Sequence, residues 1–216
     1  MPIFLSETLE FPDPTSASED GLLAIGGDLS VERLLLAYRN GIFPWYSDNQ
    51  PILWWSPNPR MVLFPEKFKV SKSLLKKINN NEFRITFNQN FKEVIANCSA
   101  IKRKEQNGTW ITSEMQESYI KLHKKGFAVS VEVWNKDELV GGLYGIDLHD
   151  SKIFCGESMF SKQTDASKIA FYFLVKKLSE EKYKLIDCQL YTAHLESLGA
   201  KEIPRKTFLK YLKSTT

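Results

Sequence analysis

Two apolar stretches of this sequence each contain one acidic residue. Glu157 lies within residues 154–160, and Asp187 lies within residues 185–190. A carboxylate buried among apolar neighbours is costly unless it is paired or hydrogen-bonded, so a chain that buries two indicates groups held for a substrate. For a single acid the simpler interpretation is that it satisfies a neighbouring polar group or caps a loop. We therefore take the two acids together as the first candidates for a site.

Each stretch has the length of a buried strand, in which side chains alternate between two faces. Strict alternation puts Gln189 on the face of Asp187, and puts Cys155 and Met159 on the face of Glu157. If the two strands are neighbours, Glu157, Asp187 and Gln189 converge beside an apolar wall. The residues predicted to form that wall are Leu143, Met159 and Ile186. Three clustered polar groups favour a functional site over the alternative that these side chains only hydrogen-bond one another.

The elements around these stretches predict how they are positioned. Predicted strands at 128–134, 138–146 and 152–160 are separated by short turns, which is typical of an antiparallel meander. A predicted helix over 165–180 and a strand over 184–190 follow, and this order gives a parallel, right-handed crossover. We predict an α+β fold with a mixed, mostly antiparallel sheet, in the element order of the acyl-CoA N-acyltransferase superfold.

The first part of the chain has a different composition, rich in Pro, Gly and Trp. One helix pattern covers 30–40, where Asp28 or Ser30 is a candidate N-cap and Gly41 a candidate stop. The prolines that follow preclude long regular elements. We expect a small loop-rich domain over residues 1–65 and an acyltransferase-like catalytic domain over 66–216.

Composition and charge exclude several classes of protein. With 216 residues, 43% of them apolar, the chain can bury a substantial core, and a net charge of only +3 argues against a strongly basic nucleic-acid binder. Cys98, Cys155 and Cys188 lack the spacing of a zinc site or a disulfide framework, so we expect no metal. No apolar run is long enough to span a membrane, and the N-terminus lacks a secretory signal pattern. We expect a cytoplasmic protein that does not bind membranes.

Several segments of the chain resemble the block motifs of the leucyl/phenylalanyl-tRNA–protein transferase family. They are GLLAIGGDLS (21–30), GIFPWYS (41–47), PILWWSPNPR (51–60), GTWIT (108–112), FCGESMFS (154–161), LIDCQ (185–189) and SLGAKEIPR (197–205). The resemblance covers most of the chain, in order. It implies an aminoacyltransferase that moves Leu or Phe, and less well Met, from aminoacyl-tRNA to the α-amine of proteins beginning with Arg or Lys. That reaction marks proteins for degradation in the bacterial N-degron pathway, and the resemblance implies no cofactor.

The resemblance also implies which residues are catalytic. Asp187 and Gln189 match the proposed catalytic pair, and Glu157 helps to place the reacting groups. The ester is already activated and an α-amine has a reference pKa of about 7.7–8.0, so no covalent enzyme intermediate is needed. We predict that Asp187 acts through Gln189 to orient and deprotonate the amine, and that backbone N–H groups of 157–159 face the oxyanion. Two roles remain possible for Glu157. It could supply the negative charge that attracts the acceptor's Arg or Lys, or it could bind the amine of the aminoacyl group.

Aromatic residues are implied to hold the end of the tRNA. Trp45 and Trp110 resemble the residues that bind the terminal adenosine, with Tyr38 and Tyr119 close to that site. From the sequence alone, packing in the core and stacking on an unpaired base explain each of these two tryptophans equally well. The apolar wall described above would then accept Leu or Phe with loose selection, because flexible Met tolerates both.

Lysines provide a candidate surface for the body of the tRNA. Lys72 and Lys76 share one face of a predicted helix at 71–78, within a cluster that contains no acid. The alternative is an ordinary solvated face. We expect a monomer whose partners are Leu-tRNA, Phe-tRNA and acceptor proteins.

Two other classes of function compete with this one. A CoA-dependent N-acetyltransferase would share the fold, but residues 161–166 do not supply the Gln/Arg-x-x-Gly-x-Gly/Ala turn that such enzymes place before the crossover helix. A catalytically inert binder of RNA or of degron-bearing proteins would leave the carboxylates in the two strands unexplained. Transfer activity separates the three.

Overall fold

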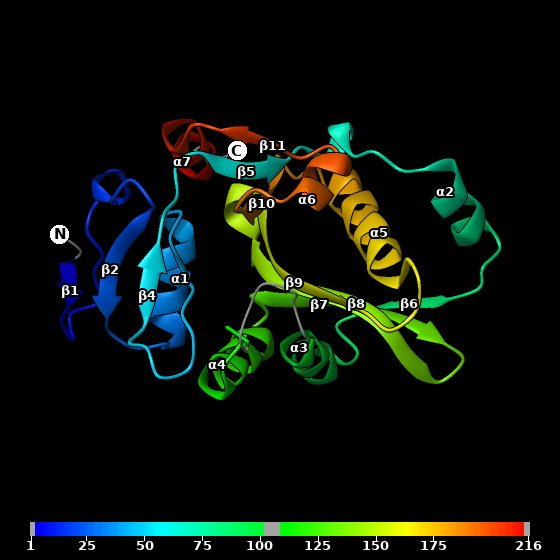
Figure 1. Cartoon of the computed structure of the whole chain (residues 1–216), viewed down its shortest axis with the longest axis horizontal. Coiled ribbons are helices and arrows are strands. Elements are labelled where there is room, and N and C mark those ends of the chain that lie inside the picture. Colours follow the sequence, from blue (N-terminus) through cyan, green and yellow to red (C-terminus); the bar gives the residue numbers. More distant parts are fainter. Residues whose placement is uncertain (1–2, 102–108, 214–216) are drawn as a thin grey trace.

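The computed structural model describes residues 3–101 and 109–213, which form two β-sheets flanked by helices (Figure 1). The smaller sheet has the spatial order β1 (Ile3–Leu5), β2 (Leu22–Gly26), β4 (Leu53–Trp55) and β3 (Phe43–Pro44). The larger sheet has the spatial order β11 (Lys201–Ile203), β5 (Arg60–Leu63), β10 (Leu185–Gln189), β9 (Ile153–Ser161), β8 (Glu138–Leu148), β7 (Ala128–Asn135) and β6 (Arg84–Phe87).

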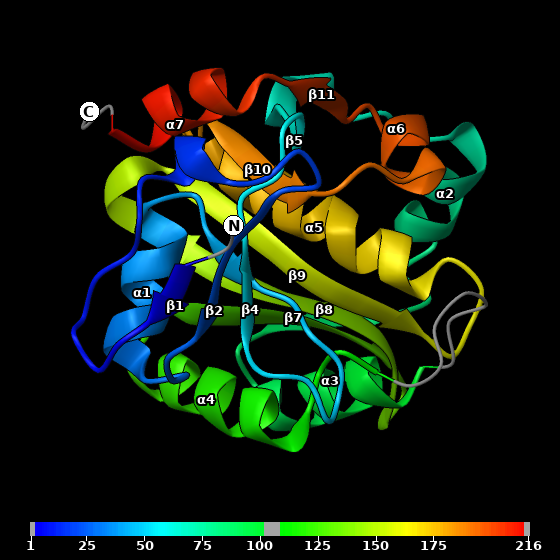
Figure 2. The ribbon, with the colours of Figure 1, turned by 60° about the vertical axis from the view of Figure 1, so that its left-hand side comes forward.

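Helices cover both faces of the larger sheet. They are α1 (Val31–Arg39), α2 (Lys72–Asn79), α3 (Phe91–Ala100), α4 (Ser113–Lys124), α5 (Ala166–Glu180), α6 (Ala193–Ser197) and α7 (Arg205–Lys213), with short 3-10 turns at Pro14–Ser16, Pro65–Lys67 and His149–Ser151. Helix α5 packs on one face of the sheet, and α3 and α4 pack on the other (Figure 1). Helix α1 lies between the smaller sheet and the larger one in Figure 1 and contacts both β3 and β8. Figure 2 shows the smaller sheet in front of the larger one.

The larger sheet confirms the predicted fold class. Strands β7, β8 and β9 form an antiparallel meander, and β9 and β10 pair in parallel through the crossover helix α5. The other pairs of this sheet are antiparallel, so the fold is α+β with a mixed, mostly antiparallel sheet. The residue patterns did not predict the strands β5, β6 and β11 of this sheet, or the helices α3 and α6.

The N-terminal part is more regular than expected. The predicted helix over 30–40 is α1, and the Ser30 hydroxyl accepts a hydrogen bond from the Arg33 backbone N–H, at 3.3 Å. The loop-rich segments also contribute a four-stranded sheet, whose strands are too short for alternation to reveal them. Trp54 anchors this sheet in the core, because it is fully buried and its indole N–H donates to the Gly26 carbonyl, at 2.8 Å.

The chain changes sheets between β4 and β5. The expected domain boundary at residue 65 lies after this point, since β5 already belongs to the larger sheet. One hydrophobic core contains residues of both parts, such as Leu34 and Trp54 from the first and Tyr144 and Leu122 from the second. The two sheets therefore stabilise each other.

Two irregularities open the larger sheet between its parallel strands. β10 pairs with β9 only from Leu185 to Asp187, whereas β9 continues to Ser161. The register of β10 against β5 shifts between Asp187 and Gln189, and the register of β8 against β9 shifts beside Glu157. Bulges of this kind bend strands and re-aim side chains. They create the gap in which the site lies.

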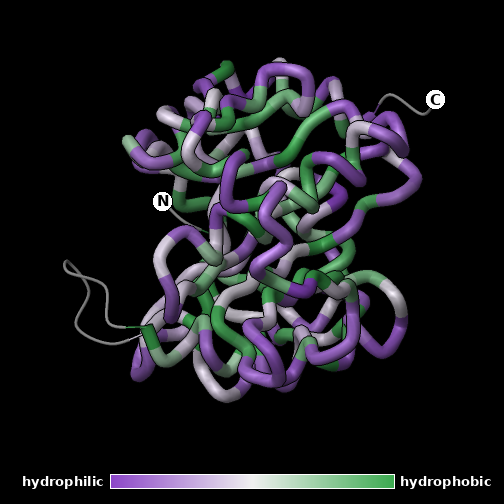
Figure 3. Tube along the Cα trace, turned by 90° about the vertical axis from the view of Figure 1, so that its right-hand side faces the viewer, coloured by the Kyte–Doolittle hydropathy of each residue, from purple (hydrophilic) through white to green (hydrophobic). Residues whose placement is uncertain are grey.

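Apolar residues lie mainly along the inner segments, and hydrophilic residues mainly along the outer turns (Figure 3). Within the part of the chain that the structure describes, no helix has the length and apolar character needed to cross a membrane.

Candidate active site

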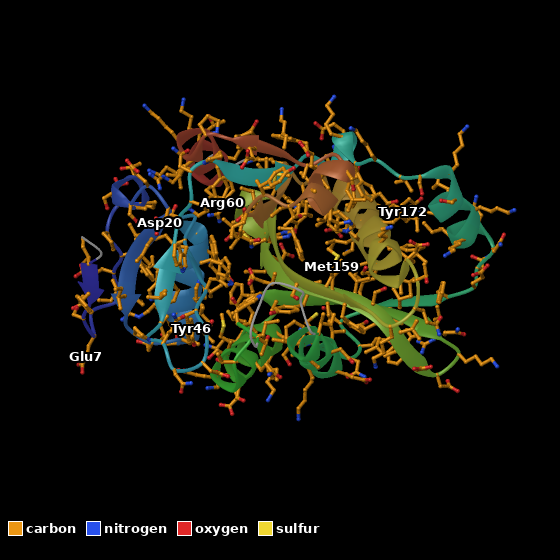
Figure 4. The ribbon with its side chains drawn as sticks, viewed as in Figure 1. Glu7, Asp20, Tyr46, Arg60, Met159 and Tyr172 are labelled. Carbon is orange, nitrogen blue, oxygen red and sulfur yellow. The ribbon has the colours of Figure 1, made fainter. Side chains whose placement is uncertain are left out.

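A pocket of about 610 Å³ lies where β9 and β10 diverge. Its polar groups include Glu157 and Gln189, and its aromatic rim includes Trp45 and Trp110. Its apolar wall contains Leu143, Phe154, Met159, Phe171, Leu174 and Ile186, so the pocket contains all three residues of the predicted wall. Met159 is labelled in the space between β9 and α5 (Figure 4). The remaining polar lining comes from Ser158, Cys188, Thr192 and His194.

Glu157 is the acidic residue of the pocket lining. Its Oε1 accepts a hydrogen bond from Gln189 Nε2 at 3.3 Å, and its Oε2 accepts one from the Tyr119 hydroxyl at 3.2 Å. Burial raises the pKa of Glu157 from 4.5 to about 8, although the hydroxyls of Tyr38 and Tyr119 act in the opposite direction. This carboxyl is therefore mostly protonated at neutral pH and ionises near pH 8, within the range in which a side chain can accept and return a proton.

Tyr38 and Tyr119 lie behind Glu157. Both side chains are buried, and their hydroxyls are hydrogen-bonded to each other. Burial and the nearby Glu157 carboxylate raise the pKa of each hydroxyl well above its ordinary value, so both stay protonated. Neither is among the described residues that line the pocket. The structure thus gives them direct contact with the acid, and no direct contact with the space that a substrate would occupy.

Asp187 has a different environment from the other predicted polar groups. It is fully buried, and its two oxygens bind Arg60 Nε and Arg60 Nη2, each at 2.7 Å. Its Oδ1 also accepts the backbone N–H of Gln189, at 3.0 Å. Asp187 is absent from the pocket lining, which the described residues define. It therefore contacts the pocket through Gln189.

Strict alternation is wrong at Asp187. Asp187 turns toward Arg60 while Gln189 turns toward Glu157, because the register shifts between them and Gln189 has a left-handed φ of 58°. At Glu157 the predicted neighbours stay close, since Met159 lines the same pocket and the Cys155 thiol lies near the carboxylate at the edge of the core. A bulge adds one residue on one strand only, so the faces exchange beyond it.

The two predicted stacking tryptophans both line the pocket and are partly exposed. The backbone carbonyl of Trp45 accepts the indole N–H of Trp55 at 2.7 Å, and their rings pack edge to face at 5.7 Å. Trp110 follows the segment 102–108, so Gly108 of the motif lies outside the described residues. Trp134 is held by the Thr86 hydroxyl at 2.9 Å, away from the pocket.

Lys72 and Lys76 are exposed on α2, as the helical pattern predicted, and the Ser71 hydroxyl caps that helix. Neither lines the pocket. Their neighbour Lys77 pairs with Asp165 at the start of α5, at 2.6 Å. The lysines therefore form a surface separate from the pocket.

Two residues of the site, Arg60 and His194, were not among those that the sequence predicted. Arg60 is 127 residues from its partner Asp187 in the sequence, and no local sequence pattern predicts that ion pair. His194 lines the pocket from α6, and burial together with Lys168 lowers its pKa, so the ring is neutral at neutral pH. Its position shortly after the second acidic strand is the signal that could have drawn attention to it. Among the described residues, no group of His, Cys, Asp and Glu could hold a metal ion.

The splayed parallel strands, the acid of raised pKa and the apolar wall define an α+β protein with a candidate enzymatic site. Comparison with known families is more specific. A model described as "Leucyl/phenylalanyl-tRNA protein transferase" matches residues 62–213, and a model of the N-terminal domain of that protein matches residues 27–58. The chain belongs to the leucyl/phenylalanyl-tRNA–protein transferase family and is an aminoacyltransferase.

Individual relatives agree with this assignment. The chain is 58% identical to the leucyl/phenylalanyl-tRNA–protein transferase of Christiangramia forsetii, over 97% of this chain and 99% of that protein. It is also 58% identical to the enzyme of the same name from Flavobacterium psychrophilum, with the same coverage. Among solved structures, a GCN5-related N-acetyltransferase from Kribbella flavida is similar with a TM-score of 0.40 and 7% identity, covering 78% of this chain and 59% of that one.

Proposed function

We propose that this enzyme transfers Leu or Phe, and less well Met, from aminoacyl-tRNA to the N-terminal α-amine of proteins that begin with Arg or Lys. The reaction would take place in the cytoplasm as a step of the N-degron pathway, with the enzyme acting as a monomer. The observation that carries the proposal is the pocket itself. It joins an aromatic rim, an apolar wall and one acid of raised pKa in a single opening of the sheet.

The binding roles follow from the lining. Trp45 and Trp110 stack on the terminal adenosine, since aromatic side chains bind unpaired bases through their faces. Leu143, Met159 and Ile186 then take the side chain of the amino acid. The additional rings and side chains of Phe154, Phe171 and Leu174 make the wall apolar throughout, which favours Leu, Phe and Met over polar amino acids.

The proposed chemistry is direct attack of the amine on the ester. The amine nitrogen bonds to the carbonyl carbon, the ester C–O bond breaks, and the ribose oxygen of the tRNA leaves. Glu157 accepts the proton that the amine loses and returns it to the ribose oxygen, because its pKa of about 8 is close to that of an α-amine. Backbone N–H groups of 157–159 at the open edge of β9 stabilise the oxyanion.

Gln189 positions the amine beside Glu157, since its side-chain amide reaches that carboxylate at 3.3 Å. Asp187 supports Gln189 through the backbone N–H, and both of its oxygens are occupied by Arg60. This geometry favours Glu157 over Asp187 as the proton acceptor. Among the described residues no other acid lines the pocket, so Glu157 is the group that would attract a basic acceptor residue when its carboxyl is ionised.

Residues 161–166, which precede α5, lack the Gln/Arg-x-x-Gly-x-Gly/Ala turn of CoA-dependent N-acetyltransferases, and this favours aminoacyl-tRNA over acyl-CoA. We propose that Lys72 and Lys76 contact the tRNA body. Neutralising both should reduce the salt dependence of tRNA affinity, because fewer counterions are released.

The decisive experiment is transfer by the purified enzyme. Charged Leu-tRNA is incubated with an Arg-initiated peptide, and the same peptide beginning with Ser is the control. We expect the mass of the Arg peptide alone to rise by one leucine residue. Equal modification of both peptides would contradict the acceptor specificity, and no modification of either with intact tRNA binding would favour an inert binder.

A further inference from the structure

Arg60 is held on all sides at the junction of the two sheets (Figure 4). Its Nε and Nη2 bind the two oxygens of Asp187, and its Nη1 donates to the carbonyl of Gly41 at 3.2 Å. The rings of Phe43 and Phe208 lie 4.8 Å and 4.7 Å from its guanidinium carbon. A planar guanidinium that is bidentate and stacked has a single orientation available.

The carboxylate that Arg60 binds also holds an unfavourable backbone conformation. Asp187 Oδ1 accepts the N–H of Gln189 at 3.0 Å, and Gln189 has a φ of 58°. A left-handed conformation costs about 1–2 kcal/mol for a residue with a side chain, so it persists only where its surroundings enforce it. Gln189 needs this conformation for its amide to reach Glu157.

Arg60 also contacts the other side of the pocket. Phe43 lines the pocket and lies close in sequence to Trp45, which belongs to the aromatic rim. One guanidinium thus connects the rim, supplied by the smaller sheet, with the turn of β10 that carries Gln189. These two sides are the parts of the pocket between which the ester and the amine must meet.

We propose that Arg60 is a positioning residue. Through Asp187 it fixes the left-handed turn at Gln189, and through Phe43 it fixes the rim, so that it sets the distance between the bound tRNA end and the reacting groups. The proposal rests on the transfer reaction proposed above for the same pocket. It assigns Asp187 to the support of Gln189 and leaves proton transfer to Glu157.

The charge of Arg60 also affects the pKa of Glu157, and this gives a second way to test the role of Arg60. The groups that face Glu157 are Tyr38 on α1, Tyr119 on α4, Gln189 and Asp187 on β10, Arg60 on β5 and the Cys155 thiol on β9. Arg60 lowers the pKa of Glu157, and Asp187 raises it. Removing the charge of Arg60 therefore moves the acidic limb of the pH–rate profile upward, whereas Lys at this position leaves it in place.

The test compares two buried arginines. Arg33 is as buried as Arg60 and pairs with Asp28 at 3.1 Å, but it lies outside the pocket lining, so Arg33→Lys controls for the loss of a buried arginine. For Arg60→Lys we expect kcat to fall about 100-fold, with KM for Leu-tRNA within about threefold, because a small misplacement of reacting groups has that effect. Arg33→Lys should keep kcat within about threefold when assayed well below its Tm. A kcat for Arg60→Lys within about threefold of the parent enzyme overturns the proposal.

Two further measurements keep the test decisive. If Arg60→Lys does not fold, the double variant Arg60→Met with Asp187→Leu removes both charges and restores stability. The kcat of this double variant should also be about 100-fold lower than that of the parent enzyme. A folded double variant with the parental kcat overturns the proposal. The ¹⁵N resonance of the Gln189 side-chain amide should shift in Arg60→Lys and stay unchanged in Arg33→Lys. This readout needs no transfer, so it separates failure of the positioning role from failure of the proposed function.

Discussion

Two glutamates of the larger sheet, Glu132 and Glu157, are held in opposite ways. Glu132 on β7 is fully buried and accepts hydrogen bonds from the hydroxyls of Thr86 and Ser130, each at 2.5 Å. It also accepts the backbone N–H groups of Gln89 and Asn90, at 3.4 Å and 3.3 Å, at the start of α3. Asn90 itself provides no side-chain cap, so Glu132 caps that helix from the neighbouring strand.

Glu157 has fewer donors and an open side. It accepts hydrogen bonds from Tyr119 and Gln189, and the rest of its surface faces the pocket. Both acids lie in apolar strands, so an argument from neighbouring residues treats them alike. The difference teaches that a buried acid is structural where donors surround it, and is available for chemistry where the fold leaves it under-bonded beside a cavity.

The sharpest way to break this comparison is to neutralise Glu157. We expect Glu157→Gln to lower kcat/KM for transfer of Leu to an Arg peptide by about 10²–10⁴-fold, because the proton acceptor is lost. The amide keeps an oxygen for Gln189 or Tyr119, so the fold should survive. Steady-state kinetics and thermal unfolding measure the two effects. Activity within a few fold of the parent enzyme would remove Glu157 from the chemistry.

The matching change at Glu132 should act on stability. Glu132→Gln replaces one acceptor oxygen by an NH₂ that faces other donors, and we expect a loss of about 2–3 kcal/mol in the free energy of unfolding. Urea denaturation measures the loss. Transfer activity should stay near that of the parent enzyme at temperatures where the variant is folded. A large loss of kcat in the folded variant would mean that Glu132 also supports the site.

The raised pKa of Glu157 predicts a pH dependence of stability. An unfolded Glu loses its proton near 4.5, whereas this carboxyl in the folded protein keeps it until about pH 8. The folded state binds more protons in that interval, so this group's contribution to stability declines as the pH rises through it. Glu157→Gln lacks this penalty. Its free energy of unfolding should exceed that of the parent enzyme by a margin that widens toward pH 8, and a constant margin would contradict the prediction.

The smallest expected effect comes from the residue behind Glu157. Tyr119→Phe removes a hydrogen bond that lowers the pKa of Glu157, so the acidic limb of kcat/KM should move upward by about half a unit to one unit. The acceptor amine titrates identically with both enzymes, so the difference isolates Glu157. Tyr183→Phe, which removes a comparable hydrogen bond to Asp147 far from the pocket, is the control. Equal shifts in both variants would refute the assignment.

The order of the elements could be predicted from residue patterns. Alternation and short turns predicted the meander β7–β8–β9, and a helix predicted from Asp165 onward gave α5 and therefore the parallel position of β10. The Asp165 side chain makes no cap hydrogen bond in the structure. A candidate cap at Ser30 predicted α1, and the spacing of apolar residues predicted α2. In the smaller sheet, β1, β3 and β4 escaped prediction because two or three residues carry no readable period, and β2 escaped because its five residues do not alternate. Helix α3 escaped because its cap comes from Glu132 on another strand.

Some features of the candidate site could likewise be predicted from residue patterns, and others could not. The sequence by itself determined that acids stand in two apolar strands, and that these strands follow one another through a crossover. Only the tertiary structure decided that Asp187 faces Arg60 while Gln189 faces Glu157, because bulges reverse the faces of a strand and sequence spacing does not reveal them. It also decided the pKa of Glu157. That value depends on burial and on hydroxyls from α1 and α4, which the chain brings together only when it folds.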